Sequence, residues 1–235
     1  MATHSVEAMR GRLIAFEGVD GCGKTTQAEL LVQRIGEPLA LLTAEPGGTA
    51  LGARLRQLIL DPESPPVSDR AEVLLLAADR AQHVSDVLEP SLEAGRWVVS
   101  DRYSGSTLAY QGYGRGIDIE ELRRLVVFAT GGLRVDLNVL IDVPPEIARA
   151  RATPERADRL ERLDAAFHQR VREGYLELAD ADRDHWVVVD GSGRVDEVSE
   201  QIHRTVIDHL GKPPSHVREV ASMTARRDSS PEGAR

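Results

Sequence analysis

Short apolar runs alternate with longer amphipathic stretches along most of the chain. The apolar runs are rich in Val, Leu and Ile, which is typical of strands buried on both faces of a parallel sheet. The stretches between them repeat their apolar residues at helical spacing, which indicates helices. Strands are predicted at 13–16, 39–43, 97–100, 137–142 and 186–189. Helices are predicted at 24–35, 71–94 with a break near Pro90, 120–130, 145–152, 159–181 and 195–210, and a further helix carries Arg54 and Arg56.

This alternation predicts βαβ units, in which a crossover helix joins each strand to a parallel neighbour. No linker-like segment separates the strands, so we expect one domain at 12–210, preceded by a short extension at 1–11. Residues 211–235 are rich in Pro, Ser and charged groups and carry few large apolar side chains. Such a segment cannot bury enough surface to offset its ordering entropy, so a disordered tail is expected.

Composition narrows the class of protein. A net charge of -9 over 235 residues argues against a protein that binds nucleic acid through a general excess of Lys and Arg. The single cysteine, Cys22, cannot form an intramolecular disulfide, and the histidines have no zinc-ligand spacing with it. No apolar run approaches the ~20 residues that span a bilayer, and residues 1–12 lack the apolar core of a secretory signal. We therefore expect a cytoplasmic protein that binds neither nucleic acid nor membranes.

Residues 18–25 match the pattern Gly, four residues, Gly-Lys-Thr, between a predicted strand and a predicted helix. Glycines in such a loop let backbone N–H groups converge on phosphates, and the helix N-terminus adds partial positive charge. Lys24 is expected to reach the β- and γ-phosphates of ATP, and the Thr25 hydroxyl to ligate Mg²⁺. The motif predicts a P-loop NTPase-type three-layer α/β fold, with a five-stranded parallel sheet flanked by helices. The expected ATP-binding residues are Gly18, Val19, Asp20, Gly21, Cys22, Gly23, Lys24, Thr25 and Thr26.

Three further segments carry arginines at or near the carboxyl ends of predicted strands, where open α/β sheets bind ligands. Residues 45–49 (Glu-Pro-Gly-Gly-Thr) follow the second strand and lead into the helix with Arg56. Arg80 lies within the long helix that comes next, and residues 101–103 (Asp-Arg-Tyr) end the third strand. Each segment alone is unremarkable, but together they describe an acceptor pocket that faces the P-loop.

The chemistry of these residues suits a small phosphorylated acceptor. Guanidinium groups bind phosphate in a bidentate manner, so we expect Arg56, Arg80 and Arg102 to surround a monophosphate and its base. Asp101 follows a buried strand, at the position where a carboxylate acts on the Mg²⁺ shell. The sequence therefore predicts a kinase that uses Mg²⁺ and ATP to phosphorylate a nucleoside monophosphate.

The same motifs resemble the thymidylate kinase family. The resemblance rests on residues 16–21 (Phe-Glu-Gly-Val-Asp-Gly), 45–49, 101–103 with 108–112 (Leu-Ala-Tyr-Gln-Gly), 114–118 and 158–161, and it covers roughly 12–210. It implies phosphorylation of dTMP to dTDP with ATP as donor, Mg²⁺ dependence, a mobile lid at about 149–160, and a homodimer. Gly21 stands where some members carry an Arg in the P-loop. The chain therefore resembles the bacterial subtype, in which an arginine from the lid serves the transition state.

The resemblance also implies roles for individual residues. Asp20 corresponds to the acid that contacts the sugar 3′-hydroxyl, Arg102 to the arginine on the acceptor phosphate, and Arg80 to one that approaches thymine. Among the lid candidates Arg149, Arg151, Arg156 and Arg159, we favour Arg151 and Arg159. The implied catalytic residues are Lys24, Asp20, Arg102, Arg151 and Arg159. The implied acceptor-binding residues are Asp20, Glu45, Pro46, Arg56, Leu76, Arg80, Arg102, Thr107, Tyr110 and Gln111, and the implied metal ligands are Thr25 and Asp101.

Two positions depart from the family pattern. Ala44 stands where many members have an Arg, and Leu76 stands where bacterial members often stack a Phe on thymine. Two other functions therefore compete with dTMP phosphorylation: phosphorylation of another nucleoside monophosphate or a deoxynucleoside, and an ATP-binding regulatory module on the same fold. The module is less favoured because it would have no reason to keep the catalytic groups Lys24, Thr25 and Arg102 together.

Overall fold

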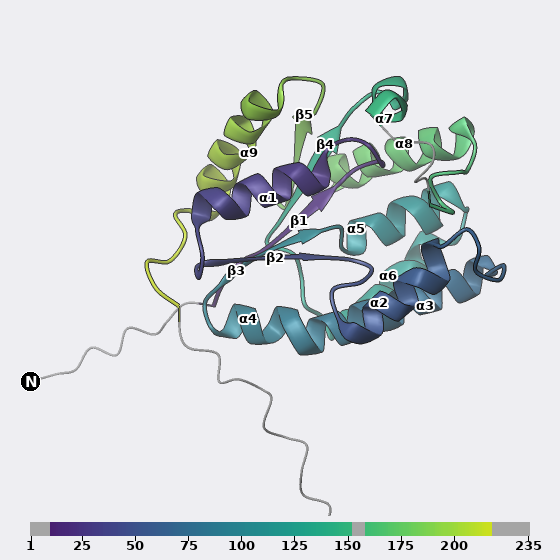
Figure 1. Ribbon diagram of the computed structural model, residues 1–235, viewed down its shortest axis with the longest axis horizontal. Coiled ribbons are helices and arrows are strands. Elements are labelled where there is room, and N and C mark those ends of the chain that lie inside the picture. The colour runs from purple at the N-terminus through teal and green to yellow at the C-terminus, as the bar shows by residue number, and fades with distance from the viewer. Residues whose placement is uncertain (1–9, 152–157, 218–235) are drawn as a thin grey trace, which may run out of the picture.

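One parallel sheet of five strands organises the molecule, in the order β2-β3-β1-β4-β5 (Figure 1). The computed structural model describes residues 10–151 and 158–217. The strands are β1 (Leu13–Glu17), β2 (Ala40–Ala44), β3 (Trp97–Asp101), β4 (Leu137–Asp142) and β5 (Trp186–Asp190). The strands match their predicted positions to within one residue, and the predicted three-layer fold is confirmed.

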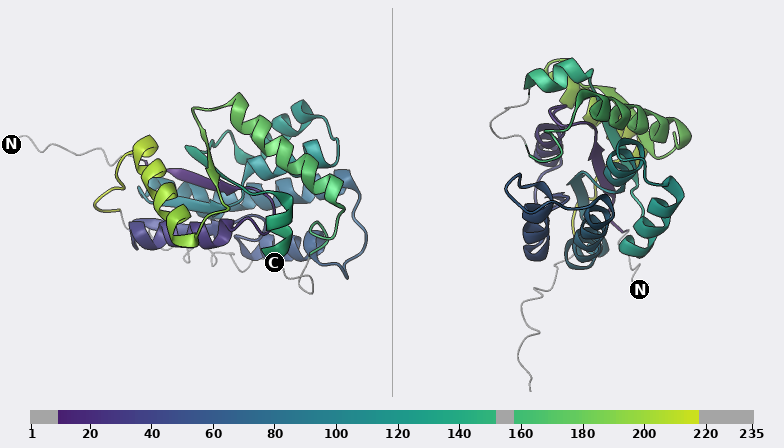
Figure 2. Two further views of the ribbon diagram at one scale, coloured as in Figure 1. Left: turned by 90° about the horizontal axis from the view of Figure 1, so that it is seen from above. Right: turned by 90° about the vertical axis from the view of Figure 1, so that its right-hand side faces the viewer.

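Helices cover both faces of the sheet. Helices α1 (Lys24–Ile35) and α9 (Val195–Leu210) lie side by side on one face, as the view from above shows (Figure 2). On the other face α4 packs on β3, and α8 packs on β4 and β5. The remaining helical segments are α2 (Ala50–Leu60), α3 (Asp69–His83), η1 (Val84–Leu88), α4 (Glu89–Glu93), α5 (Ser104–Thr107), η2 (Leu108–Gly114), α6 (Ile119–Thr130), α7 (Pro145–Arg151) and α8 (Ala165–Ala181).

The central strand shows how the core is divided. Along β1, Ile14 and Phe16 join the large core cluster that includes α1 and α9, while Leu13 and Ala15 join a smaller cluster beside η1 and α4. All four side chains are completely buried, because successive side chains of a strand point to opposite faces and both faces are covered. The unbroken apolar pattern of β1 follows from this position.

Three helical predictions differ in detail from the structure. The break expected near Pro90 takes the form of the π-helical segment η1, which ends just before that proline. Residues 159–162 form turns, and α8 begins only at Ala165, after Asp164 caps its N-terminus. Helices α5 and η2 follow β3 directly and were not predicted. The expected extension, lid and tail lie partly in residues 1–9, 152–157 and 218–235, outside the described residues.

The parallel arrangement brings the carboxyl ends of all five strands to one edge of the sheet. Glu17, Asp101 and Asp142 are the last residues of β1, β3 and β4, and the P-loop and the segment after β2 begin at the same edge. The candidate site is built along this edge. None of the helices in the described ranges is long and apolar enough to cross a membrane.

Candidate active site

The P-loop fits tightly between β1, β4 and α7. A Cβ on Gly18 would lie 2.6 Å from the carbonyl oxygen of Ile141, and one on Gly21 would lie 2.3 Å from that of Ala148. Both glycines also have positive φ, at 141° and 79°. Only glycine meets both demands at these positions, so the backbone can present its N–H groups to an anion at the start of α1.

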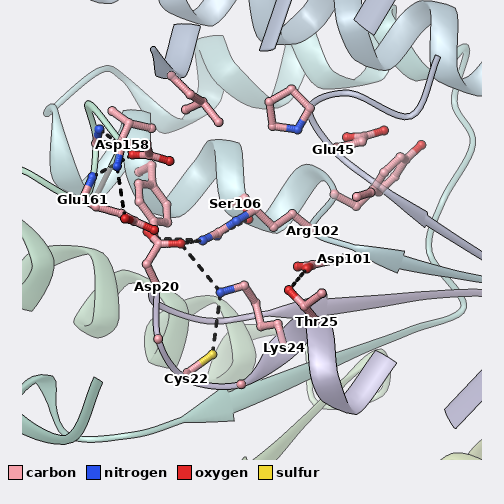
Figure 3. A pocket seen from close by; sticks show the side chains of 18 of the residues that line it. Asp20, Cys22, Lys24, Thr25, Glu45, Asp101, Arg102, Ser106, Asp158 and Glu161 are labelled. Atoms are coloured by element: carbon pink, nitrogen blue, oxygen red, sulfur yellow. Dashed lines mark hydrogen bonds and ion pairs between the residues drawn. The ribbon is translucent and has the colours of Figure 1, made fainter. Parts of the chain in front are cut away.

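Lys24 is the cation of this loop. Its side chain is 6% exposed, and Nζ donates to the carbonyl oxygen of Val19 at 2.8 Å. The same nitrogen lies 3.9 Å from Asp20 and 3.7 Å from the sulfur of Cys22 (Figure 3). Cys22 itself is buried in the core cluster, so its sulfur supports the loop from beneath. The loop therefore holds one positive charge close to its backbone N–H groups.

Thr25 and Asp101 meet beside the loop. The Thr25 hydroxyl donates to Oδ2 of Asp101 at 2.5 Å (Figure 3). The other carboxylate oxygen, Oδ1, is buried and has no hydrogen-bond partner among the described residues. A hydroxyl and a carboxylate with a free oxygen are the kind of ligands that Mg²⁺ accepts together with water and phosphate oxygens. These residues fit the metal expected from the sequence.

Arg102 is the centre of the polar network. It contacts Asp20 through Nη2, and the same nitrogen donates to the hydroxyl of Tyr110 at 3.2 Å (Figure 3). Its Nη1 donates to the hydroxyls of Ser106 at 3.1 Å and Tyr175 at 3.2 Å. The backbone of Arg102 has φ of 72°, which is unfavourable for a residue with a Cβ. The contacts of its side chain therefore hold a strained backbone in place.

Asp20 stays ionised in this environment. Burial opposes ionisation, but the charges of Arg102 and Lys24 and the hydroxyl of Tyr110, 2.6 Å from Oδ2, outweigh it and lower the pKa of Asp20. Burial raises the pKa of Tyr110 well above its ordinary value, so that its hydroxyl remains a donor. Asp20 is therefore a fixed negative charge and hydrogen-bond acceptor at the mouth of the P-loop.

Behind Arg102 lies a completely buried carboxyl group, that of Glu17. The Tyr103 backbone N–H donates to its Oε1 at 3.0 Å, and the hydroxyls of Ser106 and Tyr175 donate to its Oε2 at 2.6 and 3.1 Å. Burial raises the pKa of Glu17, and these hydrogen bonds and the charge of Arg102 only partly offset the rise. Glu17 thus ties the end of β1 to the segment that carries Arg102.

Arg80 is buried at the opposite wall. Its Nε donates to Oε2 of Glu45 at 2.7 Å, Nη1 to the Thr107 hydroxyl at 2.9 Å and Nη2 to the Tyr103 carbonyl at 2.9 Å. The other oxygen of Glu45 lies 2.8 Å from Nδ1 of the fully buried His83. The predicted residues Glu45, Arg80 and Thr107 therefore form one rigid hydrogen-bonded unit.

These groups surround a cavity of about 570 Å³. It contains most of the residues predicted for the ATP, acceptor and metal sites. The predicted residues that line it are Asp20, Gly21, Cys22, Gly23, Lys24, Thr25, Thr26, Glu45, Pro46, Arg56, Leu76, Arg80, Asp101, Arg102, Thr107, Tyr110, Gln111 and Arg151. Gly18 and Val19 lie behind it, each with its backbone carbonyl bound to a site cation, Arg102 and Lys24 respectively.

The candidate lid arginines lie in different places. Arg151, at the end of α7, lines the cavity and donates from Nη1 to the carbonyl of Gly191 at 3.0 Å. Arg159 does not line it, and its Nη2 instead donates to the carbonyls of Asp61, Ser64 and Pro65 at 3.1, 2.7 and 3.1 Å. Arg149 is exposed, and Arg156 lies outside the described residues.

Several residues of the site were given no role from the sequence, although Asp158 and Glu161 lie in a segment that carries the family resemblance. Glu17 and Tyr175 anchor Arg102 from behind, and Asp158 and Glu161 line the cavity next to Asp20 (Figure 3). Burial raises the pKa of both Asp158 and Glu161. Glu17 could have been found from its place, since a carboxyl group directly before the P-loop interrupts an otherwise apolar strand. Tyr175 offered no such signal.

Comparisons with known proteins agree with this geometry. A family model described as thymidylate kinase matches residues 16–202. A curated thymidylate kinase from Carboxydothermus hydrogenoformans is 52% identical over 193 residues, which are 81% of this chain and 94% of the relative. One from Synechococcus sp. (strain RCC307) is 47% identical over 211 residues, which cover 86% and 98% of the two chains. The crystal structure of thymidylate kinase from Ehrlichia chaffeensis superposes with a TM-score of 0.70 at 29% identity, covering 84% of this chain and 98% of that one.

Proposed function

This chain belongs to the thymidylate kinase family, which transfers the γ-phosphoryl group of ATP to dTMP, and we propose that its P-loop and the surrounding arginines perform that transfer. The enzyme converts ATP and dTMP to ADP and dTDP. Transfer of a phosphoryl group needs little covalent chemistry from the protein, because catalysis consists mostly of alignment and of stabilising the charge on the moving group. Each residue of the site is therefore assigned to one of three tasks: binding a substrate, aligning the two substrates, or neutralising charge on the transferred phosphoryl group.

The donor side is formed by the P-loop and its metal ligands. The backbone N–H groups of residues 18–25 hold the ATP phosphates, with Lys24 on the β- and γ-phosphates. We assign Thr25 and Asp101 to Mg²⁺, because the buried Oδ1 of Asp101 lacks a partner among the described residues. When bound, Mg²⁺ neutralises charge on the phosphate oxygens and orients them. Cys22 packs under the loop and has no assigned part in the chemistry.

The acceptor side is formed by the network around Arg102. This guanidinium lies at the carboxyl end of the central strands, bound to Asp20 and close to the P-loop, so it is positioned to hold the dTMP phosphate in line with ATP. Arg56, which donates to the Pro46 carbonyl at 2.9 Å, assists from α2. Asp20 accepts a hydrogen bond from the sugar 3′-hydroxyl, and Arg80, Thr107, Tyr110 and Gln111 enclose the sugar and base. The placement of Arg102 between the P-loop and the cavity is the observation that carries this assignment.

The lid supplies the last positive charge. We assign Arg151 and Arg159 to the transferred phosphoryl group, where a guanidinium delivered at the moment of reaction offsets developing negative charge. Arg151 is already at the cavity, whereas Arg159 must first leave the three carbonyls it contacts between positions 61 and 65. A closing lid also excludes water, which would otherwise take the phosphoryl group.

A coupled assay of ADP release tests the function directly. Purified protein with Mg²⁺ and ATP is offered dTMP, dUMP, UMP, CMP, dCMP, AMP, GMP or thymidine. We expect dTMP to give the highest kcat/KM. A higher kcat/KM for another monophosphate or for thymidine would identify that compound as the substrate, and Leu76 and Ala44 would be the first residues to test as the cause. ADP release that does not depend on any acceptor would favour the regulatory ATP-binding module.

We further propose a homodimer that forms through α2, α3 and α6. Exposed apolar side chains occur on these neighbouring helices, and Phe128 is 85% exposed. Large exposed apolar groups on neighbouring helices are typical of a protein interface. The exposed residues concerned are Leu51, Leu58, Leu74, Val127 and Phe128.

Light scattering coupled to gel filtration tests the dimer. Phe128→Glu should shift the protein towards monomer. Val188→Glu changes a half-exposed residue on the edge strand β5 and serves as the matched control, which should stay dimeric. A wild-type monomer would refute the proposal. We also propose the cytoplasm as the compartment, with which a single, unpaired cysteine is compatible.

A further inference from the structure

One face of α3 runs along the acceptor cavity. Glu72, Leu76 and Arg80 are spaced four residues apart, so they share that face. Leu76 and Arg80 line the cavity directly. Glu72 does not, because Gln111 lies in front of it: Gln111 is 2% exposed and lines the cavity, and Glu72 behind it is 1% exposed. A buried acid directly behind a pocket residue requires an explanation, since burying a charge is costly unless it is paired.

The contacts of Glu72 are specific on both oxygens. Oε1 accepts from Nε2 of Gln111 at 2.9 Å, and Oε2 accepts from Nη2 of Arg115 at 2.9 Å. Arg115 is itself positioned by Asp69, 3.4 Å from its Nε, and by the ring of Phe167. Glu72 forms an ion pair with Arg115, and a carboxylate in such a pair can only accept hydrogen bonds. The amide nitrogen of Gln111 must therefore face Glu72.

This constraint decides what Gln111 can offer a ligand. An amide carries one acceptor and one donor group, and rotating it by half a turn exchanges them. With the nitrogen committed to Glu72, the carbonyl oxygen Oε1 is left for the cavity, and no hydrogen bond to it is formed within the described ranges. Gln111 thus presents a hydrogen-bond acceptor to the cavity, and Glu72, which does not line the cavity, fixes the amide in this orientation.

The base of the acceptor lies at this wall if the proposed function holds. The phosphate must approach the P-loop and Arg102, so the base lies in the part of the cavity that is lined by α3 and by the helical segments that follow β3. That part contains Leu76, Thr107 and Gln111. Thymine and uracil carry an N–H at ring position 3, whereas cytosine carries a lone pair there. Only the first two can donate to a fixed carbonyl.

We propose that Glu72 is a specificity-determining positioning residue: by fixing the Gln111 amide with its carbonyl towards the base, it selects monophosphates whose pyrimidine has a protonated N3. With cytosine, the N3 lone pair would face the Gln111 carbonyl oxygen. Both atoms are hydrogen-bond acceptors, so both would stay buried and unpaired. A site that is built to receive an N–H rejects an analogue that lacks one far more strongly than it senses a methyl group. Glu72 thus excludes dCMP, while the distinction between dTMP and dUMP is made elsewhere in the pocket.

The test is Glu72→Gln, which keeps the shape of the side chain but can present either an oxygen or an NH₂ group to Gln111. The Gln111 amide is then free to turn. We expect the ratio of kcat/KM for dTMP to that for dCMP to fall by at least about tenfold, while the dTMP to dUMP ratio and the KM for ATP stay unchanged. Asp69→Asn is the matched control, because it removes another acid beside Arg115 without touching Gln111, and it should keep the wild-type ratios.

The outcomes distinguish a failure of the role of Glu72 from a failure of the proposed function. An unchanged dTMP to dCMP ratio in Glu72→Gln, or an equal fall in Asp69→Asn, overturns the role of Glu72 and leaves the dTMP kinase intact. A wild-type enzyme that phosphorylates neither dTMP nor dUMP overturns the proposed function instead. Should Glu72→Gln fail to fold, the double variant with Arg115→Gln removes both charges of the buried pair and is expected to show the same fall in the ratio.

Discussion

The hydroxyl of Thr25 donates a 2.5 Å hydrogen bond to Asp101, across 76 positions of sequence. The bond joins the first turn of α1 to the end of β3, so the two expected metal ligands come from different elements of the fold. It leaves Oδ1 of Asp101 buried with no partner among the described residues. A cation at this point would use a carboxylate oxygen that is already stripped of water.

Asp101→Asn should therefore weaken the response to Mg²⁺. The amide keeps the size and the bond to Thr25 but removes the negative charge, so we expect the Mg²⁺ concentration for half-maximal activity to rise about ten- to a hundredfold. A titration of activity against Mg²⁺ measures this. Asp142→Asn at the end of β4 is the control, since Asp142 is paired with Arg172 at 2.7 Å. An unshifted titration for Asp101→Asn would remove it from the metal site.

Arg102→Lys should damage acceptor binding more than donor binding. A lysine keeps the positive charge, but its single ammonium group cannot contact Asp20 and the hydroxyls of Tyr110, Ser106 and Tyr175 at once, as the guanidinium group does. We expect kcat/KM for dTMP to fall about a hundredfold, with the KM for ATP changed little. Steady-state kinetics with each substrate varied in turn measures both constants. Equal losses of kcat/KM for ATP and for dTMP would mean that Arg102 maintains the structure of the site as a whole and does not bind the acceptor in particular.

The two assigned lid arginines should differ in what their removal costs. Arg151→Ala removes a guanidinium already at the cavity, so kcat should fall about a thousandfold with little change in melting temperature. Arg159→Ala also removes three bonds to the 61–65 carbonyls, so it should lower the melting temperature as well as kcat. Rapid-quench kinetics and thermal unfolding test the pair. If Arg159→Ala lowers only the melting temperature, its place is in the fold and its catalytic assignment is wrong.

Glu17→Gln should change how stability depends on pH. The pKa of Glu17 is raised in the folded protein above its ordinary value of 4.5, so the folded state binds the proton more tightly than the unfolded state. This contribution favours folding below 4.5 and is lost as pH rises through the folded-state pKa. The free energy of unfolding of the wild type, relative to the variant, should consequently fall between acidic and neutral pH. Chemical denaturation at a series of pH values measures the difference, and a constant offset would contradict it.

Leu76→Phe should tighten dTMP binding. Leu76 lines the cavity at the position expected for the base, and an aromatic ring there would gain about 1 kcal/mol of stacking, or roughly fivefold in affinity. Calorimetric titration with dTMP measures the change, and Val188→Phe, at a half-exposed position on β5 outside both the cavity and the proposed dimer face, is the control. Weaker binding by Leu76→Phe would mean that the cavity is already filled by its own packing.

The features of this protein that could be predicted are those formed by residues adjacent in the sequence. The P-loop is contiguous, and the strands are short apolar runs with defined ends, so both were located to within a residue or so. Arg56, Arg80 and Arg102 were also found, because each follows a strand end or lies in a segment that the family pattern marks.

What could not be predicted depends on contacts across the fold. Tyr175 reaches Glu17 across 158 positions, and Gln111 meets Glu72 across 39, with no local pattern to reveal either pairing. Arg159 is a different case: its charge and position predict a catalytic role, and in the described structure its guanidinium donates to the backbone carbonyl of Ser64, just after α2. Nothing in the sequence near Arg159 states which acceptors lie within its reach.

The π-helical turn at Leu108–Gly114 constrains how many residues this segment of the chain can contain. Such a turn contains one residue more than the α-helical turn it replaces. Deleting one codon there would let an ordinary α-helix form and would rotate Gln111 relative to Thr107 by about 100°. One of the two would then leave the cavity. A change of length between these two residues should therefore abolish acceptor binding, even though it alters no side chain of the cavity.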